Sequence, residues 1–583
     1  MKRKLLEDWI KGGLLAVALL VVGLVEAAPG RVTILHTNDT HAHIDDGHVA
    51  FSAIAVEKAR AKASGDNVLL VDAGDYVQGT ALGGFDEGRT VIDIMNAAGY
   101  DVATLGNHEF DYGIPALFRN VERSKFKVTS CNFLKRETRD APGRLVLPPY
   151  VVATAGTVRV AFVGVTTPTA LVSAKPSTFL DPTGTFRQYD FIAGEKGKDL
   201  YAALQKNVND AAKEADYVVV LGHLGVSPEC AGYMSTDVIA HTTNFVAFID
   251  GHSHSEYTGS RVKNAAGQDV VLTQSGSYLG VLGFVTLEGG HCVAAGTIYP
   301  RGEKSAEVEV LEKRLSAAVE RQLGVCIARA EKTLCAYTPD GHQRLARSSD
   351  CGAGDFAADA AWWYAEEKAG VSCDIALMNG GNVRADIPAG DVTLKTMRTV
   401  QPFAGDIGIV EASGQVILDA LEFGAQVVGK GESGGFLHVA GLRYSIDKDQ
   451  DSSVQVDGTG AWVSGPLNGV YRVYNVEVYN RATQTWEPLD LKATYRVVGN
   501  AFTLVEGGDG FAMFRRARII NNAVNTDYLV LAEYAKAFKT GSDGVPRLGS
   551  GQSPLRTRAR YPLNYENPTG SKRIRIGKRK AGN

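Results

Sequence analysis

The sequence predicts an α/β protein of two domains joined by a helix, and three observations carry this prediction. The chain has 583 residues, more than one domain usually holds. Between about residues 31 and 290, apolar runs typical of buried parallel strands alternate with helical stretches such as 50–63 and 199–215. After an amphipathic helix over 303–323, a second set of short strands and helices begins near residue 330.

Composition gives no reason to expect a nucleic acid polymer as partner. The formal net charge is −4, and no basic stripe interleaves with the 22 Tyr and 21 Phe. The proportions are those of an ordinary soluble globular chain.

The first 28 residues are typical of a secretory signal peptide. A basic start precedes an apolar stretch over 13–24, and small residues suited to cleavage follow at 25–28. At 1.5 Å per residue the stretch spans roughly 18 Å, short of the ~30 Å hydrocarbon core of a bilayer. We expect a secreted, periplasmic or cell-surface protein with no stable membrane span after cleavage; an uncleaved anchor is the alternative. The basic end of the chain, residues 561–583, is interpreted as a solvated tail, with weak adhesion to acidic surfaces as the alternative.

Seven cysteines are present, and four of them crowd one region: Cys326, Cys335, Cys351 and Cys373. An exported protein can oxidise such thiols, so one or two disulfides are expected there. Because seven is odd, at least one thiol stays free or pairs between chains.

Five apolar runs of the first domain are each followed by side chains that can bind a metal. The runs are residues 32–35, 68–71, 102–105, 217–221 and 246–249, and the side chains after them are Asp39 and His41, Asp75, Asn107, His223, and His252 with His254. Buried strands of a layered α/β fold open onto loops at one edge, so these seven side chains are expected to meet. A single Asp-x-His is usually only a loop, but five such strand ends favour a metal site.

Carboxylate, amide and imidazole without thiolate suit a first-row divalent ion. Seven ligands are too many for one tetrahedral site and suit two ions about 3.5–4 Å apart, with Asp75 as the bridge. Zn²⁺ is expected, and Mn²⁺, Co²⁺ or Mg²⁺ are alternatives.

His108 follows Asn107 and precedes Asp111 by three residues, within reach if the chain turns helically. We interpret His108 and Asp111 as a catalytic pair that steadies charge on a transferring phosphoryl group or protonates a leaving oxygen. A simple helix-capping role for Asp111 is the alternative.

These motifs resemble those of a known family. Thr37-Asn38-Asp39-Thr40-His41, Gly74-Asp75, Gly106-Asn107-His108-Glu109-Phe110-Asp111, Gly222-His223 and Gly251-His252-Ser253-His254 are similar to the ordered motifs of calcineurin-like metallophosphoesterases. Asn379-Gly380-Gly381-Asn382-Val383-Arg384, Gln401-Pro402-Phe403 and Gly507-Gly508-Asp509-Gly510 resemble the carboxyl-terminal domain of the 5′-nucleotidase family. The resemblance covers nearly all of residues 31–560.

The resemblance implies a four-layer α/β/β/α metallophosphoesterase domain over 29–300, a connecting helix over 301–329, and an α+β nucleotide-binding domain over 330–560. A surface helix of the first domain is the alternative for the connecting segment. In the family the second domain rotates to deliver substrate. One metal would be held by Asp39, His41, Asp75 and His254, and the other by Asp75, Asn107, His223 and His252. His108 and Asp111 match the family's catalytic dyad.

The resemblance also implies substrate contacts in the second domain. Arg347, Asn379 and Arg384 match contacts to the anionic group, Phe436 one face of a base clamp, and Asp509 a ribose contact. Arg347 as a surface charge and Phe436 as core are the alternatives. Two positions depart from the family: the second clamp position holds Thr503, with Phe502 one place earlier, and Asn382 stands where relatives often carry glycine.

The expected function is therefore an exported phosphohydrolase that releases phosphate from nucleoside 5′-monophosphates by in-line attack of a metal-bound water. Hydrolysis of 2′,3′-cyclic nucleotides or of UDP-sugars on the same metals is an alternative. A nucleotide-binding protein without activity is the non-enzyme alternative. The sequence leaves the oligomeric state open.

Overall fold

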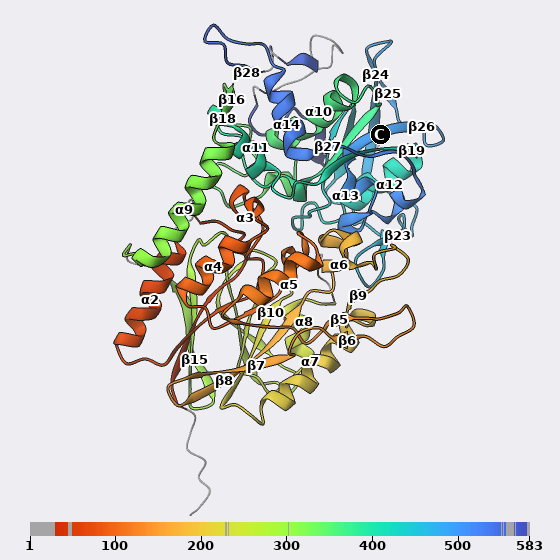
Figure 1. Cartoon of the computed structure of the whole chain (residues 1–583). Coiled ribbons are helices and arrows are strands. Elements are labelled where there is room, and N and C mark those ends of the chain that lie inside the picture. Colours follow the sequence, from red (N-terminus) through yellow and green to blue (C-terminus); the bar gives the residue numbers. More distant parts are fainter. Residues whose placement is uncertain are drawn as a thin grey trace, which may run out of the picture.

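The chain is described by a computed structural model at residues 30–44, 49–227, 230, 232–300, 302–549, 551, 553–555, 565 and 567–579. Two bodies are visible in Figure 1, the first coloured red to yellow-green and the second green to blue. The expected signal peptide over 1–28 lies outside the described residues. In the described part of the chain, no helix has both the length and the apolar character needed to cross a membrane.

Two six-stranded sheets form the centre of the first domain, in the orders β15-β14-β1-β2-β3-β4 and β12-β13-β11-β10-β8-β7. The first sheet contains β1 (Val32–Thr37), β2 (Val68–Asp72), β3 (Val102–Thr104), β4 (Lys127–Thr129), β14 (Leu282–Glu288) and β15 (His291–Ile298). The second contains β7 (Tyr150–Ala155), β8 (Val158–Thr166), β10 (Tyr217–His223), β11 (Ala247–Ile249), β12 (Glu256–Lys263) and β13 (Asp269–Ser275). A small sheet of β5 (Phe133–Lys135), β6 (Arg144–Leu145) and β9 (Tyr189–Phe191) lies beside them.

Helices cover the outer face of each sheet. Those on the first sheet share a core with β1 and β2 and are α2 (Phe51–Ala63), α3 (Ala81–Phe85), α4 (Arg89–Ala98), α5 (Ile114–Arg123) and α9 (Ala306–Leu323). Those on the second sheet share a core with β8 and β10 and are α7 (Lys198–Ala211) and α8 (Ser235–His241). The short α6 (Ala170–Ser173) faces the second domain. The predicted four-layer α/β/β/α arrangement is confirmed.

Side-chain alternation along β10 explains why the strands read as continuous apolar runs. Tyr217, Val219 and Leu221 pack between the two sheets, whereas Val218 and Val220 pack against α7 and α8. Successive side chains of a strand point to opposite faces, and here both faces are covered. The central strands of the first domain are therefore apolar at every position until they reach the edge that carries polar side chains.

The helix α9 leads from the first domain to the second and also packs on the first. Val308, Leu315 and Val319 enter the core that α2 and α4 share with the first sheet. Figure 1 shows α9 (green) beside α2 (red) and continuing toward the second domain, where β16 (Cys326–Ala330) follows it. The segment therefore has features of both interpretations, the connecting helix and the surface helix of the first domain.

The second domain is built on a five-stranded sheet in the order β20-β17-β26-β19-β27. Its strands are β17 (Ile375–Asn379), β19 (Asp406–Ser413), β20 (Leu437–Ala440), β26 (Thr494–Asn500) and β27 (Arg518–Thr526). One face packs on α10 (Gly352–Glu367), α11 (Leu394–Val400) and α14 (Asp527–Lys536), and the other on α12 (Gly414–Gly424) and α13 (Ala501–Leu504). Smaller sheets hold β16, β18 (Gly390–Thr393) and β28 (Arg547–Leu548); β21 (Leu442–Asp447), β24 (Val473–Asn480), β25 (Thr485–Pro488) and β29 (Ile574–Gly577); and β22 (Gln455–Val456) with β23 (Trp462–Ser464).

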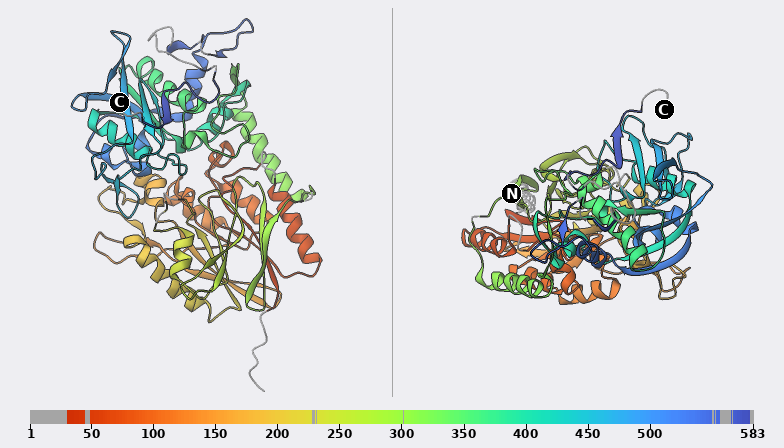
Figure 2. Two further views of the ribbon diagram at one scale, coloured as in Figure 1. Left: turned by 180° about the vertical axis from the view of Figure 1, so that it is seen from behind. Right: turned by 90° about the horizontal axis from the view of Figure 1, so that it is seen from above.

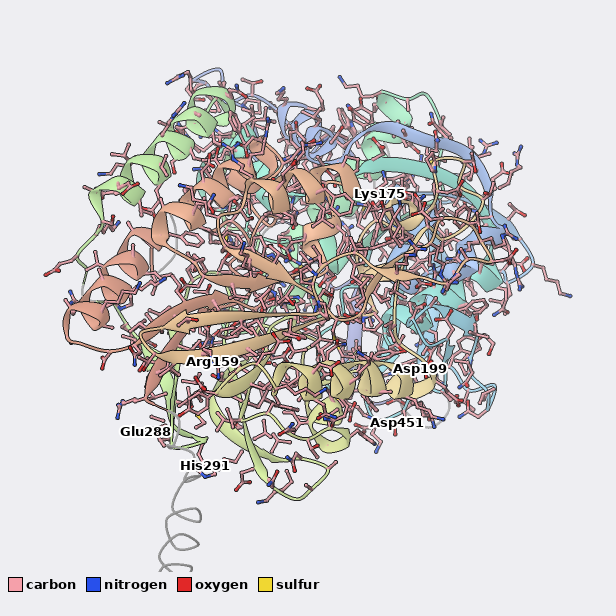
Figure 3. All side chains as sticks on the ribbon, turned by 60° about the horizontal axis from the view of Figure 1, so that its bottom comes forward. Arg159, Lys175, Asp199, Glu288, His291 and Asp451 are labelled. Atoms are coloured by element: carbon pink, nitrogen blue, oxygen red, sulfur yellow. The ribbon has the colours of Figure 1, made fainter. Side chains whose placement is uncertain are left out.

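Polar contacts join the two domains around their interface. Ser177 Oγ donates to a Glu506 carboxylate oxygen at 2.8 Å, and Lys175 Nζ lies 3.4 Å from the other oxygen. Figure 3 places Lys175 where the ribbon of the first domain meets that of the second. The reverse view in Figure 2 shows the two domains in contact along this side. Elsewhere Tyr278 Oη lies 3.2 Å from Tyr337 Oη. The domains therefore meet through side chains from loops of both.

The expected disulfides are absent. All seven cysteines lie in the described part of the chain, and no disulfide joins any two of them. Their thiols are engaged locally: Cys326 Sγ donates to the Ala328 carbonyl, and Cys351 Sγ accepts the Gly354 N–H at the start of α10. Closeness in sequence did not bring these side chains together, because they lie on separate elements.

The expectation of a solvated tail is wrong for the part of the tail that is described. Residues Ile574–Gly577 form β29, which pairs in parallel with β21. Arg573 is 4% exposed and donates to both carboxylate oxygens of Asp359. A buried arginine that is paired bidentately is a structural anchor, so the basic charge of this segment secures the chain end to the second domain.

Candidate active site

The carboxyl ends of the central strands converge on a cavity of about 1150 Å³ between the domains. Strands β1, β2 and β3 are parallel neighbours, as are β10 and β11, so their ends lie at common edges. Of the seven predicted metal ligands, Asp75, Asn107, His252 and His254 line the cavity, and Asp39, His41 and His223 lie fully buried beneath.

The predicted ligands form two groups that share Asp75. In one group, His254 Nε2 lies 3.4 Å from Asp39 Oδ1 and 3.0 Å from His41 Nε2. In the other, His223 Nε2 lies 3.1 Å from Asp75 Oδ2, and His252 completes the cluster. Asp75 Oδ2 is also 3.8 Å from His41 Nε2. Asp75 therefore stands between the groups, where a bridging ligand is required.

Backbone groups orient the ligands for metal binding. The Nδ1 atoms of His41 and His223 lie 2.7 Å from the carbonyl oxygens of Gln78 and Ala73. An imidazole that donates one N–H to a carbonyl presents the lone pair of its other nitrogen, as metal-binding histidines do. The Nε2 atoms of both rings consequently face the carboxylates.

The backbone at the ligands is strained. Asp39, His41, Asp75, His252 and His254 all have positive φ angles, between 49° and 76°. Residues other than glycine avoid this left-handed region, at about 1–3 kcal/mol each, and such outliers gather at functional sites. The fold thus holds five strained residues at the strand ends, where their side chains form the two ligand groups.

Electrostatics in the cluster favour bound cations. Burial and the nearby Asp75 raise the pKa of Asp39 to about 7. Burial would also raise the pKa of Asp75, but His223, His108 and His41 hold it well below its ordinary value. Within the described residues, the buried Asn107 Oδ1 has no hydrogen-bond partner. Two buried carboxylates, several imidazole lone pairs and a free amide oxygen fit a pair of divalent ions.

His108 and Asp111 form the predicted pair. The short helix at His108–Phe110 places His108 Nδ1 at 2.6 Å from Asp111 Oδ2, and Nε2 lies 4.0 Å from Asp75 Oδ2. Burial lowers the pKa of His108, but Asp111 and Asp75 raise it more, so the net direction is upward. Asp111 does not cap the helix that follows, because the N-cap of α5 is Gly113; it is instead the C-cap residue of the short helix His108–Phe110. His108 is also close enough to His41 and Asp75 to ligate a metal.

Arginines of the second domain complete the wall. Arg384 is 8% exposed, and its Nη2 lies 3.4 Å from His41 Nε2; Arg347 lines the same cavity. Arg344 was not predicted, yet its Nη1 lies 3.3 Å from His254 Nδ1 and its Nε pairs with Glu432. The available signal was its position three residues before Arg347, at the N-cap of the helical turn Leu345–Arg347.

Two family models match the chain: "Calcineurin-like phosphoesterase" at residues 32–256 and "5′-nucleotidase, C-terminal domain" at residues 327–516. The chain belongs to the 5′-nucleotidase family. This is a family of phosphoric monoester hydrolases, so the predicted family and enzyme class are confirmed, and the divalent-metal chemistry of the first domain follows from it.

Known proteins resemble the chain along nearly its whole length. The snake venom 5′-nucleotidase of Gloydius brevicauda is 26% identical over 562 residues, which cover 88% of this chain and 87% of that protein. The 5′-nucleotidase of Bos taurus is 26% identical over 579 residues, covering 90% and 92%. The crystal structure of a 5′-nucleotidase precursor from Thermus thermophilus superposes with a TM-score of 0.72 at 26% identity, covering 94% of this chain and all of that one.

The aromatic residues of this nucleotidase-family site depart from expectation. Phe502 lines the cavity and lies so close over Gly508 that a Cβ there would come within 2.2 Å of the ring. Phe436 is fully buried, packs against His438 and belongs to the core beneath the sheet. Phe423 lines the cavity instead. The structure thus favours the core alternative for Phe436, since the start of β20 turns its ring inward.

The polar residues Asn379, Asp509 and Asn382 are also defined by their contacts. Asn379 Nδ2 donates to Asp509 Oδ2 at 2.7 Å, and both residues line the cavity. Asn382 Nδ2 donates to Asp527 Oδ2 at 3.1 Å. The extra side chain at the position where relatives often carry glycine is therefore used to hold α14.

Glu109 is a site residue that sequence reasoning overlooked. Its carboxylate accepts the N–H groups of Gly106, Asp75 and Tyr76 at 2.7–2.8 Å and is 3% exposed. It thereby ties the loop that carries Asp75 to the loop that carries Asn107. The signal was present in the sequence, because a carboxylate that follows His108 in a buried loop needs several donors.

Proposed function

We propose that the protein is a two-metal phosphohydrolase that acts, after export, on nucleoside 5′-monophosphates. The observation that carries this proposal is the position of Asp75. It joins two groups of donors at the floor of a cavity whose other wall presents arginines and aromatic rings. That combination suits a substrate with an anion at one end and a flat base at the other.

The residues that would hold the metals are those predicted: Asp39, His41, Asp75 and His254 for one ion, and Asp75, Asn107, His223 and His252 for the other. We propose Zn²⁺, with Mn²⁺, Co²⁺ or Mg²⁺ as alternatives. Two such ions supply positive charge for the phosphoryl oxygens and lower the pKa of water toward neutrality.

The chain's own residues bind and orient the substrate. Arg347 and Arg384 donate to the phosphate oxygens with planar forks. Asp111 fixes His108 Nδ1, so that the proton on Nε2 is available to the leaving oxygen of the nucleoside.

The sugar and the base are held by the second domain. Asn379 uses its Nδ2 on Asp509, and its Oδ1 has no hydrogen-bond partner among the described residues. An acceptor suits a ribose hydroxyl better than a phosphate, so we place Asn379 beside Asp509 at the sugar. Phe502 offers its exposed face to the base.

Measuring the products formed from AMP, 2′,3′-cyclic AMP and UDP-glucose, with metal analysis of the same sample, tests the proposal. The products to follow are phosphate from AMP, a ring-opened nucleoside monophosphate from the cyclic substrate, and UMP from UDP-glucose. We expect the fastest turnover with AMP, loss of activity with EDTA, and recovery with Zn²⁺ or Mn²⁺. Tight AMP binding without phosphate release would instead favour a binding protein.

A larger nucleotide is the second candidate, because the cavity volume of about 1150 Å³ exceeds the ~300–1,000 Å³ of usual ligand pockets. Faster hydrolysis of UDP-glucose than of AMP would favour it. Sequencing the mature amino terminus from culture medium or a periplasmic extract tests export, with cleavage expected near residue 28.

A further inference from the structure

A phenylalanine of the second domain covers the catalytic histidine of the first. The ring of Phe403 lies 5.5 Å from the ring of His108 between centroids, tilted by 35°. The guanidinium carbon of Arg384 lies 5.6 Å from the centre of the same phenyl ring. His108 is only 8% exposed as a result of these and neighbouring contacts. Phe403 thus sits between the proposed proton donor and a proposed phosphate ligand.

The loop that carries Phe403 is held in place by specific contacts. It follows α11, and Ala404 adopts a left-handed conformation with φ of 52°. The Gly405 carbonyl accepts the Asp527 N–H at 2.8 Å, and Asp527 also receives Asn382 Nδ2. A strained residue whose neighbour Gly405 is fixed by a backbone hydrogen bond indicates a constrained position rather than a chance one.

The ring contact supplies a restraint that the dyad lacks. The one hydrogen bond that His108 Nδ1 donates to Asp111 fixes a single atom of the imidazole and leaves rotation about that bond open. A phenyl ring against the imidazole face limits this rotation and excludes water, which strengthens the hydrogen bond in the drier site. Because Phe403 belongs to the second domain, His108 gains the restraint only where the two domains meet.

We propose that Phe403 is a positioning residue that holds the His108 imidazole for proton transfer. This inference rests on the proposed function. It predicts an effect on kcat that depends on His108, since a misplacement of about 1 Å at a reacting group can cost on the order of 100-fold in rate. Two other roles predict different results: support of Arg384 would change KM, and direct stacking on the base would change KM without regard to His108.

A double-mutant cycle separates these roles. Phe403→Leu is expected to lower kcat on AMP by on the order of 10- to 100-fold, with KM within about threefold. Phe403→Tyr keeps the ring and should restore most of kcat. Phe284→Leu, the same change at a partly buried phenylalanine of β14 that does not line the cavity, is the matched control and should leave kcat and KM near those of the unmutated protein.

The decisive measurement is the pair of changes in one chain. In a His108→Ala background, Phe403→Leu should lower kcat by less than about twofold, because the imidazole it acts on is gone. The inference is wrong if the losses of kcat caused by Phe403→Leu and by His108→Ala multiply in the double variant. It is also wrong if Phe403→Leu changes only KM and this change disappears in an Arg384→Gln background. Metal content and thermal unfolding of each variant verify that the site and fold are intact. If the unmutated protein hydrolyses none of the phosphoesters tested, the proposed function fails and this inference fails with it. If the unmutated protein is active and the losses multiply, only this inference fails.

Discussion

The two walls of the cavity are built on different principles. The first-domain wall takes its donors from the ends of buried strands, with strained backbone and with side chains fixed by carbonyl groups. The second-domain wall takes its side chains from loops and single helical turns, such as those at Leu345–Arg347, Gly380–Asn382 and Gly508–Gly510. We call the first-domain wall the metal wall and the second-domain wall the substrate wall. The geometry of the metal wall is therefore set by one domain alone, whereas the position of the substrate wall depends on how the two domains meet.

This difference determines what a substitution on each wall is expected to remove. Charges on the metal wall are buried and mutually compensating, so removing one leaves the others uncompensated in a medium of low dielectric constant. Side chains on the substrate wall, such as the partly exposed Arg347 and Phe502, do not belong to the buried cluster of charges. Removing one therefore costs binding energy but leaves the chemistry in place. The predictions below compare the two walls, beginning with the largest expected effect.

Asp75→Asn should have the largest effect. The change removes the carboxylate that joins both ligand groups, so at least one cation site is lost. Several kcal/mol of charge stabilisation correspond to a drop in kcat/KM on the order of 10³-fold or more. Metal analysis should show less than the full complement of bound metal. Unchanged metal content together with full activity would contradict the bridging role.

His108→Ala should lower kcat on AMP by about 10²- to 10⁴-fold, the usual contribution of a positioned proton donor. The metal content is expected to stay near that of the unmutated protein. Because His108 also lies near His41 and Asp75, the metal measurement is the discriminating one. Loss of metal in this variant would make His108 a ligand and overturn its assignment to the dyad.

The metal wall was predictable from sequence because it depends on local apolar runs. Each ligand follows such a run by two to six residues, so the strand ends could be located without the fold. The start of the helix α10 at Gly352 was harder to locate, because glycine is a poor helix former and two glycines lie in its first turn. Gly354 tolerates no side chain there, since a Cβ would come within 2.2 Å of His438, a contact invisible in sequence.

The substrate wall was predicted less well because it depends on long-range packing. The sequence around Phe436 does not indicate that its ring is directed into the core at the start of β20. The sequence around Arg344 likewise does not indicate that His254 is its neighbour. The positive φ angles of the ligands were likewise unpredictable, because aspartate and histidine do not ordinarily require that conformation. Continuous apolar runs locate the strands, but they do not say which loops face each other across two domains.

Glu109→Gln tests how far the metal wall depends on its backbone supports. A glutamine can accept N–H groups through one oxygen only and turns an NH₂ toward the others, so the loops of Asp75 and Asn107 should shift. Loss of such a supporting contact typically costs about 10- to 100-fold in metal affinity or activity.

The matched control for Glu109 is Glu312→Gln. Glu312 is also a buried carboxylate that accepts a backbone N–H and a hydroxyl, both from Ser52, but it lies on α9 among helices. This control should lower thermal stability without changing metal affinity. Equal loss of metal in both variants would attribute the effect of Glu109 to general destabilisation.

Phe502→Ala should produce the smallest of these effects and one confined to the substrate wall. Loss of one stacked base costs about 1–3 kcal/mol, which corresponds to a rise in KM for AMP on the order of 10-fold with kcat nearly unchanged.

Phe436→Leu is the control variant for Phe502→Ala. Because that ring is fully buried in the core and off the cavity, its replacement should lower the free energy of unfolding by about 1–3 kcal/mol and leave KM within about twofold. The reverse pattern, a large change in KM at Phe436 and none at Phe502, would show that the base stacks on Phe436 after a rearrangement of the domain interface, and the substrate wall would then have to be redrawn around that ring.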